Sequence, residues 1–456
     1  MPIQTLLGLI TSLFVLCPSA AQSIISYDDV AVIVNSNSPA SVQIGNYFIA
    51  ARSIPSNHLI TIDAPLTTSI TQSEFLPLRA AIEDHLIQNE LVDSINYIVT
   101  TLGVPVRIDN GTCDSLYQFN KCSSFDTEVA LLLGPLASNI AAIGYVANPF
   151  LNSTQHHTRA TSGIYLVTRL AGPSLVDVLQ LIDRSGPGLV VDGTGVLMVG
   201  DINNPDSSAG VQAFWNDIIQ EVTDPVIDIG PTVMIDTTSQ FLDDLDNVVG
   251  YVSLTGFAEP WLPNFSWAPG ALAVEWYSYS GLHYDTPGIQ PGYDRLSDWI
   301  GQGATAAVGT VNLTYASPWY NTRGTFERYL DTSYHFNAAE SMYAGISWLS
   351  WIYEAIGDPK TSIQWSGLTG LGEAPPSPSM ILVPNPSNGS FHVRMPAETV
   401  ASVMIHDAMG RSIPFVSRSI NDQLEVDLTG SNPGLYQVWV LTSSGRTLTG
   451  RLVVQP

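Results

Sequence analysis

The chain has 456 residues, of which 45% are hydrophobic and 12% are charged, and its formal net charge at pH 7 is −25. This apolar content excludes an intrinsically disordered acidic protein. The acidic balance argues against nucleic acid as a partner, because contacts to phosphate groups need a basic face.

The N-terminus has the pattern of a cleaved secretory signal. A largely apolar run at residues 6–16 is too short to cross a bilayer as a helix, and small residues follow at 19–21. We therefore expect residues 1–21 to be a signal peptide, cleaved after Ala21. The segment lacks the usual Lys or Arg, so a buried N-terminal helix is the alternative. No later window is apolar enough to predict a membrane span.

Residues 22–366 predict an α/β core, in which a mainly parallel sheet is flanked by helices. Continuous apolar runs that alternate with amphipathic stretches are typical of strands buried on both faces. The predicted strands are 30–34, 59–62, 95–99, 164–167, 196–199 and 248–252, and the predicted helices include 75–91, 174–183 and 211–222. If the core has two lobes, the glycine-rich stretch near 186–195 is the expected seam.

Polar residues within or just after these strands are candidates for ligand binding, because open parallel sheets bind ligands outside the carboxyl ends of their strands. The candidates are Asn35, Thr101, Arg169, Asp201 and Tyr251. The alternative for the small polar residues is that they cap the following helices. For Arg169, an ion pair with Asp126 or Asp201 is the alternative to an anion clamp.

Familiar catalytic motifs are missing from the core. It has no G-x-S-x-G elbow, phosphate loop or zinc-binding histidine spacing. Ser278 or Ser280 is a candidate nucleophile, and His283 is its candidate general base. A peptidase-like hydrolase therefore stays an alternative. The acidic loops 201–206 and 243–246 offer oxygen ligands without EF-hand spacing, so we expect no cofactor, with Ca²⁺ as the alternative.

Cys113 and Cys122 lie nine positions apart in a polar stretch. In an oxidising compartment two such cysteines favour a local disulfide, which closes the loop between them. A reactive thiol is the alternative.

The last part of the chain predicts a separate module. Residues 367–378 are rich in Gly, Pro and Ser and read as a linker, and residues 379–456 alternate short period-two strands with turns. We expect a small antiparallel β-sandwich there. A carbohydrate-binding or adhesion sandwich is one interpretation of this tail.

Four motifs make the tail more specific. They are VPNP at 383–386 followed by Gly389, IHDAMGR at 405–411, PGLY at 433–436, and a final strand at the C-terminus. In this the tail resembles the C-terminal sorting domain of type IX secretion. The resemblance implies the type IX secretion machinery as a partner and passage through the periplasm to the medium or the outer cell surface. It also implies cleavage of the tail and release or anchoring to surface lipopolysaccharide.

The core resembles an uncharacterised family of exported bacterial proteins. The matching segments are 47–55, 97–107, 125–131, 167–173, 303–311 and 356–359. With the sorting tail, the last two also resemble gingipain-like cysteine peptidases of caspase-type fold. Those enzymes need a His and a Cys after successive strands, yet residues 250–253 have no His and 275–281 have no Cys. We therefore interpret the core as a binding or structural module without cysteine-peptidase catalysis, with a serine or carboxylate hydrolase as the alternative.

Overall fold

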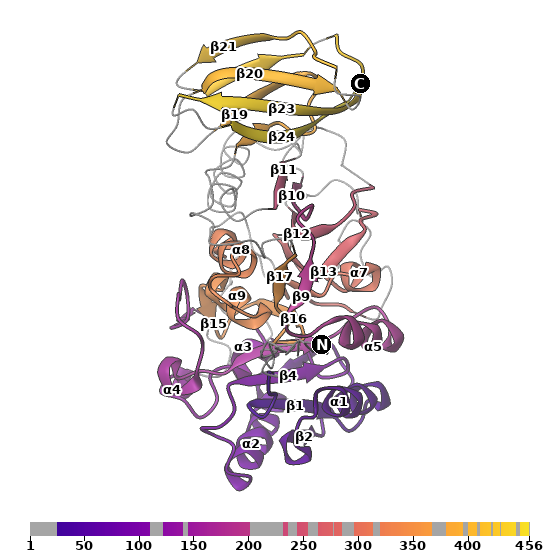
Figure 1. The fold of residues 1–456 in the computed structure, drawn as a ribbon. Coiled ribbons are helices and arrows are strands. Elements are labelled where there is room, and N and C mark those ends of the chain that lie inside the picture. The colour runs from indigo at the N-terminus through magenta and orange to yellow at the C-terminus, as the bar shows by residue number, and fades with distance from the viewer. Residues whose placement is uncertain are drawn as a thin grey trace, which may run out of the picture.

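The apolar runs of the core form one ten-stranded sheet in the computed structural model, with helices on both sides (Figure 1). All predicted core strands overlap strands of this sheet. The structure describes residues 25–109, 122–139, 145–200, 231–235, 244–253, 263–276, 278–284, 296–312, 320–366, 380–394, 400–407, 411–420, 423–428, 430–443 and 447–455.

The sheet is mixed, although most neighbouring strands are parallel. β14 and β16 pair antiparallel, and a single residue pair, Ile356 with Arg169, links β16 to β8. Across the sheet the order is β11 (Thr232–Ile235), β10 (Val196–Gly200), β12 (Val248–Ser253), β13 (Trp267–Glu275), β14 (Ala306–Thr310), β16 (Tyr353–Gly357), β8 (Leu166–Leu170), β4 (Tyr97–Thr101), β1 (Val30–Asn35) and β2 (Leu59–Ile62).

Helices cover both faces of the sheet. One side carries α1 (Pro39–Arg52), α5 (Leu175–Arg184) and α7 (Leu296–Gln302), and the other carries α8 (Thr322–Leu330) and α9 (Ala338–Gly345) (Figure 1). Capping explains where several of them begin. α1 starts with Pro39 after an Ser38 N-cap, and α2 (Gln72–Gln88) starts with a capping box between Thr71 and Glu74.

Short elements complete the core. The helices are α3 (Phe125–Val129) and α4 (Arg159–Ser162), with 3₁₀ turns at Ser56–His58 and Ala137–Asn139. The small sheets are β3 (Ser69–Thr71) with β5 (Arg107–Asp109) and β6 (Cys122–Ser124), β7 (Val146–Ala147) with β15 (Trp348–Leu349), and β9 (Leu189–Val191) with β17 (Ile363–Trp365). Apolar residues from Tyr27 to Trp365 pack into one continuous buried cluster. The two-lobe division near 186–195 stays a prediction.

The C-terminal module is a sandwich of two antiparallel sheets, as predicted. It has its own buried cluster, which includes Phe391 and Val438. One sheet has the order β18 (Ile381–Val383), β19 (Ser390–Arg394), β22 (Gln423–Asp427) and β21 (Val416–Ile420), and the other has β20 (Val400–Asp407), β23 (Gly434–Thr442) and β24 (Thr447–Val454).

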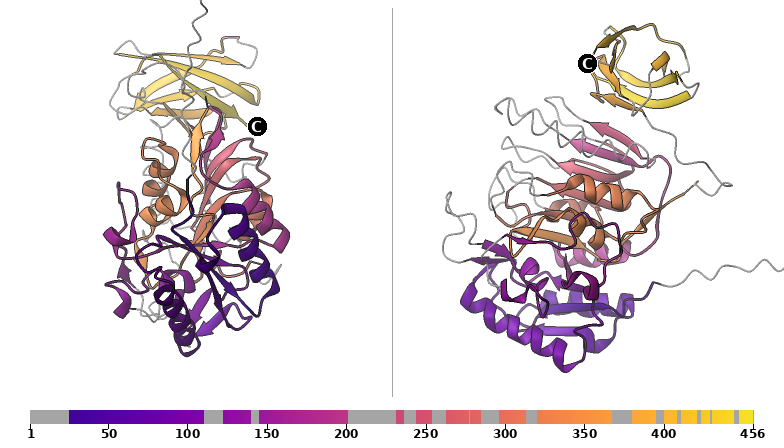
Figure 2. Two further views of the ribbon diagram at one scale, coloured as in Figure 1. Left: turned by 60° about the horizontal axis from the view of Figure 1, so that its bottom comes forward. Right: turned by 90° about the vertical axis from the view of Figure 1, so that its left-hand side faces the viewer.

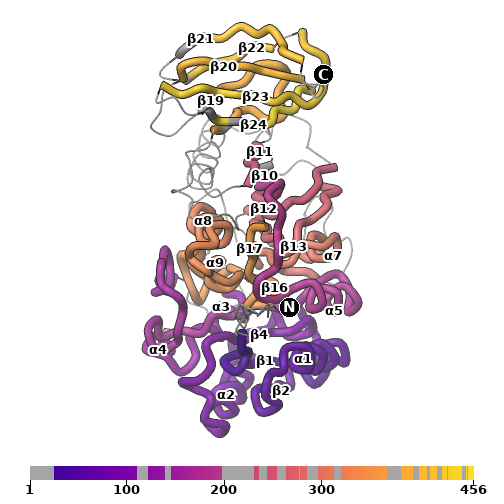
Figure 3. The backbone as a smooth tube through the Cα atoms, in the orientation of Figure 1, coloured from indigo at the N-terminus to yellow at the C-terminus, as the bar shows by residue number. Residues whose placement is uncertain are grey.

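The sandwich meets the core at the edge strand β11 (Figures 2 and 3). The main-chain N–H of Ile235 donates to the carbonyl of Asn385 at 3.1 Å, and the N–H of Asn385 donates back at 3.1 Å. The predicted signal peptide, the helix at 211–222 and the linker lie outside the described residues. Within the described part, no helix is both long and apolar enough to cross a membrane.

Candidate functional site

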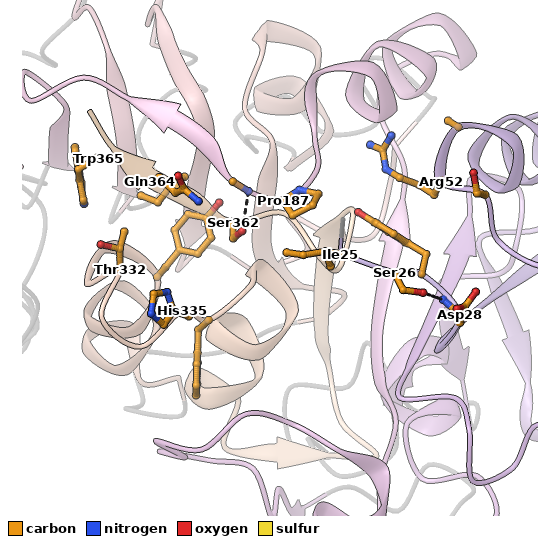
Figure 4. A pocket seen from close by; sticks show the side chains of 17 residues that line it. Ile25, Ser26, Asp28, Arg52, Pro187, Thr332, His335, Ser362, Gln364 and Trp365 are labelled. Carbon is orange, nitrogen blue, oxygen red and sulfur yellow. Dashed lines mark hydrogen bonds between the residues drawn. The ribbon is translucent and has the colours of Figure 1, made fainter. Parts of the chain in front are cut away.

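A cavity of about 920 Å³ opens beside the start of β1 (Figure 4). Five chain segments line it: residues 25–28, the end of α1, the turn at 187–188, the connection between α8 and α9, and β17. In Figure 4 Asp28, Ser26 and Arg52 lie on one side, Trp365 and Thr332 lie on the other, and Ile25 and Pro187 lie between them. The cavity is therefore built by parts of the chain that are far apart in sequence.

One wall of this cavity contains Arg52, which an ion pair holds in place. Arg52, the last residue of α1, donates from Nε to Asp358 Oδ2 at 2.7 Å. Asp358 is completely buried, and it also accepts from the Tyr27 hydroxyl at 3.0 and 2.9 Å. The helix ends there because Ser53 adopts a left-handed conformation, with φ of 54°. The wall is thus fixed by both charge and hydrogen bonds.

Titration does not loosen this wall near neutral pH. Burial lowers the pKa of Arg52, but the charges and hydrogen bonds of Asp358 and Tyr27 together outweigh this effect, and the pKa is raised. Burial and the neighbouring Asp358 both raise the pKa of Tyr27. Arg52 therefore keeps its charge and Tyr27 remains a hydroxyl donor.

A second cation fastens the start of the described chain. Lys360 Nζ donates to the carbonyl of Ser26 at 2.5 Å and pairs with Asp29 Oδ1 at 2.5 Å. The same ammonium lies 5.4 Å from the ring centroids of Tyr27 and Tyr97. Residues 25–28 are held as a wall of the cavity by these contacts.

β17 closes the far side of the cavity. Ser362 Oγ accepts from the N–H of Gly188 at 2.9 Å, and the indole N–H of Trp365 donates to the carbonyl of Leu330 at 2.9 Å. Gln364 and His335 are exposed, whereas Trp365 is only 9% exposed. This wall therefore exposes the polar side chains of Gln364 and His335, whereas Trp365 is packed in the core.

Two of the predicted rim residues bind other parts of the protein instead of facing a crevice. The Asn35 side chain donates to the carbonyls of Ala64 at 3.1 Å and Gly103 at 2.8 Å. Thr101 Oγ1 donates to the carbonyl of Ile33 at 3.0 Å and contacts Ser41 Oγ at 2.6 Å. Both side chains are fully buried. They join loops and strands at the carboxyl end of β1, opposite the cavity.

Arg169 forms the ion pair expected as the alternative to an anion clamp. Its Nη2 lies 2.6 Å from Asp126 Oδ1, its Nε contacts Glu354, and all three side chains are buried. The guanidinium also donates to the carbonyls of Val104 at 2.8 Å and Pro105 at 3.1 Å. Arg169 therefore links β8 to α3, to β16 and to the segment before β5 through ion pairs and hydrogen bonds.

Two carboxyl groups share this one guanidinium. Burial, and then the charge of Asp126, raise the pKa of Glu354 well above its usual range, against the opposing effect of Arg169. The raised pKa favours the neutral form of Glu354, so Asp126 is the main counter-charge of Arg169 in this cluster.

Tyr251 does not lie near Arg169 and its two acidic partners. Tyr251 lies within β12, 3% exposed, with its ring 5.3 Å from Trp299 and 5.2 Å from Phe265. It packs in an aromatic cluster on the far side of β14 and β16 from β8. Asp201 lies outside the described residues.

The serine and histidine candidates share one turn after β13. Ser280 is fully buried, and its Oγ accepts from the N–H of Thr310 at 3.3 Å. Ser278 and His283 are partly exposed. A nucleophile must reach its substrate, so the buried position of Ser280 fits a structural role, and the Ser278–His283 alternative stays a prediction.

The disulfide and metal expectations fall partly outside the described residues. Cys113 lies there, so its pairing stays a prediction, whereas Cys122 is fully buried with its Sγ 3.2 Å from Asn312 Nδ2. Residues 201–206 and 243 also lie outside, and Asp244 accepts from Asn264 Nδ2 at 2.7 Å. Across the described part of the chain, no three His, Cys, Asp or Glu side chains gather as metal ligands would.

The cavity was not predicted from the sequence, because candidate ligand-binding residues were placed only at the carboxyl ends of strands. One signal was present: Arg52 and Asp358 belong to two of the segments, 47–55 and 356–359, that carry the resemblance of the core to exported proteins. Their meeting in space could not be derived from a spacing of 306 positions.

Residues 382–455 match the family described as the secretion system C-terminal sorting domain. The chain therefore carries a type IX sorting domain, as its tail motifs predict. Such a domain is recognised by the type IX secretion machinery, which places this protein in the medium or at the cell surface.

No curated protein matches the chain. Among solved structures, it is similar to CopC from Methylosinus trichosporium OB3b, with 19% identity and a TM-score of 0.15, over 18% of this chain and 95% of that one. It is also similar to a double mutant of the endo-β-1,4-mannanase of Cellulomonas fimi, with 12% identity and a TM-score of 0.15, over 83% of this chain and 81% of that one. None of these comparisons supports a gingipain-like or caspase-like core.

Proposed function

We propose that this protein is an exported binding protein whose core takes a ligand in the cavity beside β1. The observation that carries this proposal is the cavity itself, about 920 Å³ in volume and lined by five distant chain segments. Ligand sites of this size combine packed apolar walls with a few fixed polar groups. The Arg52–Asp358 pair and the packed Trp365 supply both features.

The lining favours binding over catalysis. Asp28 and His335, its two exposed ionisable side chains, lie on opposite sides of the view in Figure 4. General acid–base work needs partners within hydrogen-bond reach of the reacting group. Arg52 is already paired with Asp358, so it serves the wall rather than a reaction.

Export completes the proposed function. Residues 1–21 are removed at the inner membrane, Cys113 pairs with Cys122 in the periplasm, and the sorting domain is cleaved as the core leaves the cell. The released core is free in the medium or anchored to lipopolysaccharide. Intact-mass measurement of the secreted protein tests these steps, since each changes the mass by a known amount.

Blocking the cavity tests the binding role. Thr332 is half-buried in the lining, and Thr332→Trp would fill the space in front of it. We expect ligands selected on the unmodified chain from peptide, oligosaccharide and lipid libraries to lose affinity at least tenfold for this variant. The control is Thr161→Trp, at an exposed position of α4 that does not line the cavity. Equal binding by all three proteins would remove the proposal.

A further inference from the structure

We infer that the ligand of this cavity is an extended polypeptide segment, which adds as a new strand to the outer edge of β17. The inference rests on the proposed function and names the chemical class of its ligand. An exposed strand edge is a ready template for pairing with another chain, and main-chain hydrogen bonds then supply much of the affinity.

β17 uses one of its two edges. It pairs in parallel with β9, with Ile363 opposite Leu189 and Trp365 opposite Val191. The N–H of Leu189 donates to the carbonyl of Ser362 at 2.8 Å, and the N–H of Ser366 donates to the carbonyl of Val191 at 2.7 Å. Because the main-chain groups of a strand alternate between its two neighbours, Gln364 also faces β9. Ile363 and Trp365 therefore direct their N–H and carbonyl groups to the other side.

That other edge is unpaired. Among the described residues, the main-chain N–H and carbonyl groups of Ile363 and Trp365 have no hydrogen-bond partner. Both residues line the cavity, and both are nearly buried, at 5% and 9% exposed. Polar main-chain groups in such surroundings are almost always paired. A strand in the cavity would supply the missing partners.

The lining indicates which side chains the peptide carries. Ile25 and Pro187 give apolar contacts, so alternate positions of the added strand would be apolar. Asp28 is exposed at one end of the cavity, and Arg52 in the lining is already paired with Asp358. The net charge of −25 favours a cationic partner in the same way. We therefore expect a Lys or Arg at the end of the peptide near Asp28.

The aromatic residues argue against a sugar as the ligand. Oligosaccharides stack on exposed ring faces, but Tyr329 is 1% exposed, Phe336 is 3% exposed and Trp365 is 9% exposed. Their rings pack in the hydrophobic core, and the Tyr329 hydroxyl also donates to the carbonyl of Gly270 at 2.6 Å. The unpaired groups in this wall are the main-chain N–H and carbonyl groups of Ile363 and Trp365. A peptide strand offers the acceptors and donors that these groups need.

A pair of substitutions at one position tests the strand addition. The probe is the tightest peptide selected on the full chain from a phage-displayed library of random heptapeptides, labelled for fluorescence anisotropy. Ile363→Pro removes the free N–H, and Ile363→Ala removes the same buried side chain but keeps that N–H. Loss of a main-chain hydrogen bond and the added ring should weaken binding at least tenfold in the proline variant. The alanine variant should stay within about threefold of the unmodified chain. Equal weakening in both would overturn strand addition.

Amide hydrogen exchange on the unmodified chain covers the case in which the proline variant does not fold. Bound peptide should slow exchange at Ile363 and Trp365 at least tenfold and leave Gln364, already paired with β9, nearly unchanged. If peptide binds and these two amides exchange as before, the inference is wrong while the binding function stands. If oligosaccharides but no peptides are selected and Thr332→Trp blocks them, the inference again fails alone. If nothing is selected at all, both fail.

Discussion

Arg52 and Asp358 lie 306 positions apart in the sequence, and their side chains form an ion pair with Nε and Oδ2 2.7 Å apart. The pair joins the end of α1 to the residue after β16, and Arg52 lines the cavity. Because the Asp358 side chain is completely buried and that of Arg52 is 14% exposed, the two groups depend on each other for their solvation.

Removing one charge of this pair should destabilise the core strongly. Asp358→Asn leaves the Arg52 guanidinium without its counter-charge in a largely buried position, and we expect a loss of about 3 kcal/mol in the free energy of unfolding. Urea unfolding followed by tryptophan fluorescence measures it. The matched control is Glu83→Gln, which breaks the more exposed pair with Arg79 at 3.0 Å and should cost less than about 1 kcal/mol. Similar losses for both variants would contradict this account of the wall.

The two acids beside Arg169 should respond differently to amide substitution. Burial and Asp126 raise the pKa of Glu354, so Glu354→Gln should not destabilise the core and should make it more stable above the unfolded pKa of about 4.3. Asp126→Asn removes the charge that balances Arg169 and should cost about 3 kcal/mol or more.

The same pair of variants has a pH signature. A carboxyl whose pKa is raised on folding contributes stability at low pH and loses it as the pH rises above the unfolded pKa of about 4.3. The unmodified chain should therefore lose stability relative to Glu354→Gln as the pH rises above about 4.3. Parallel pH profiles for the two proteins would show that Glu354 is ionised.

His157 should make the core sensitive to acid. Burial, opposed by the charge of Glu340, lowers the pKa of His157 to about 4, whereas an unfolded histidine titrates near 6.5. The unfolded chain then binds a proton first, so stability is complete above about pH 6.5 and falls by roughly 3 kcal/mol as the pH approaches 4. His157→Gln should remove this slope, and the exposed His335→Asn should leave it in place. Unfolding free energies across this pH range provide the measurement.

Asn385 should matter more to the sorting domain than its neighbour Asn388. Its side chain donates to the carbonyl of Arg451 at 2.7 Å and accepts from the N–H of Val453 at 2.9 Å, and it is 2% exposed. Asn385→Ala leaves these main-chain groups unpaired and should cost about 1–3 kcal/mol in the unfolding of residues 379–456. Asn388 is exposed, so Asn388→Ala should cost less than about 0.5 kcal/mol. Differential scanning calorimetry of both variants separates the outcomes, and equal shifts would contradict the role given to Asn385.

The parts of the fold that depend on local pattern could be predicted from the sequence. The strand predicted at 59–62 has the observed bounds, and the helix predicted at 75–91 differs from α2 by three residues at each end. Apolar periodicity and capping act within a few residues, so they are visible in the chain itself. The antiparallel pairing of β14 with β16 joins segments 43 or more positions apart, and no local pattern encodes it.

The site was harder to predict than the fold. The polar residues at strand ends suggested a crevice, but Asn35 and Thr101 satisfy main-chain groups around them. Whether a polar side chain faces a ligand or its own backbone depends on loops that pack from elsewhere. The ion pair of Arg169 was predicted as one of two alternatives, because a cation in so acidic a chain is expected to have an acidic partner. Asp126 was one of the two partners expected.

Cell fractionation tests most directly the claim that a sorting tail exports a separately folded core. In a host with a working type IX system, the full chain should reach the medium or the cell surface, and the chain that ends at residue 378 should stay folded in the periplasm. Resistance of the retained core to limited proteolysis reports its folding. If the shortened chain is released as efficiently as the full chain, residues 379–456 do not direct export.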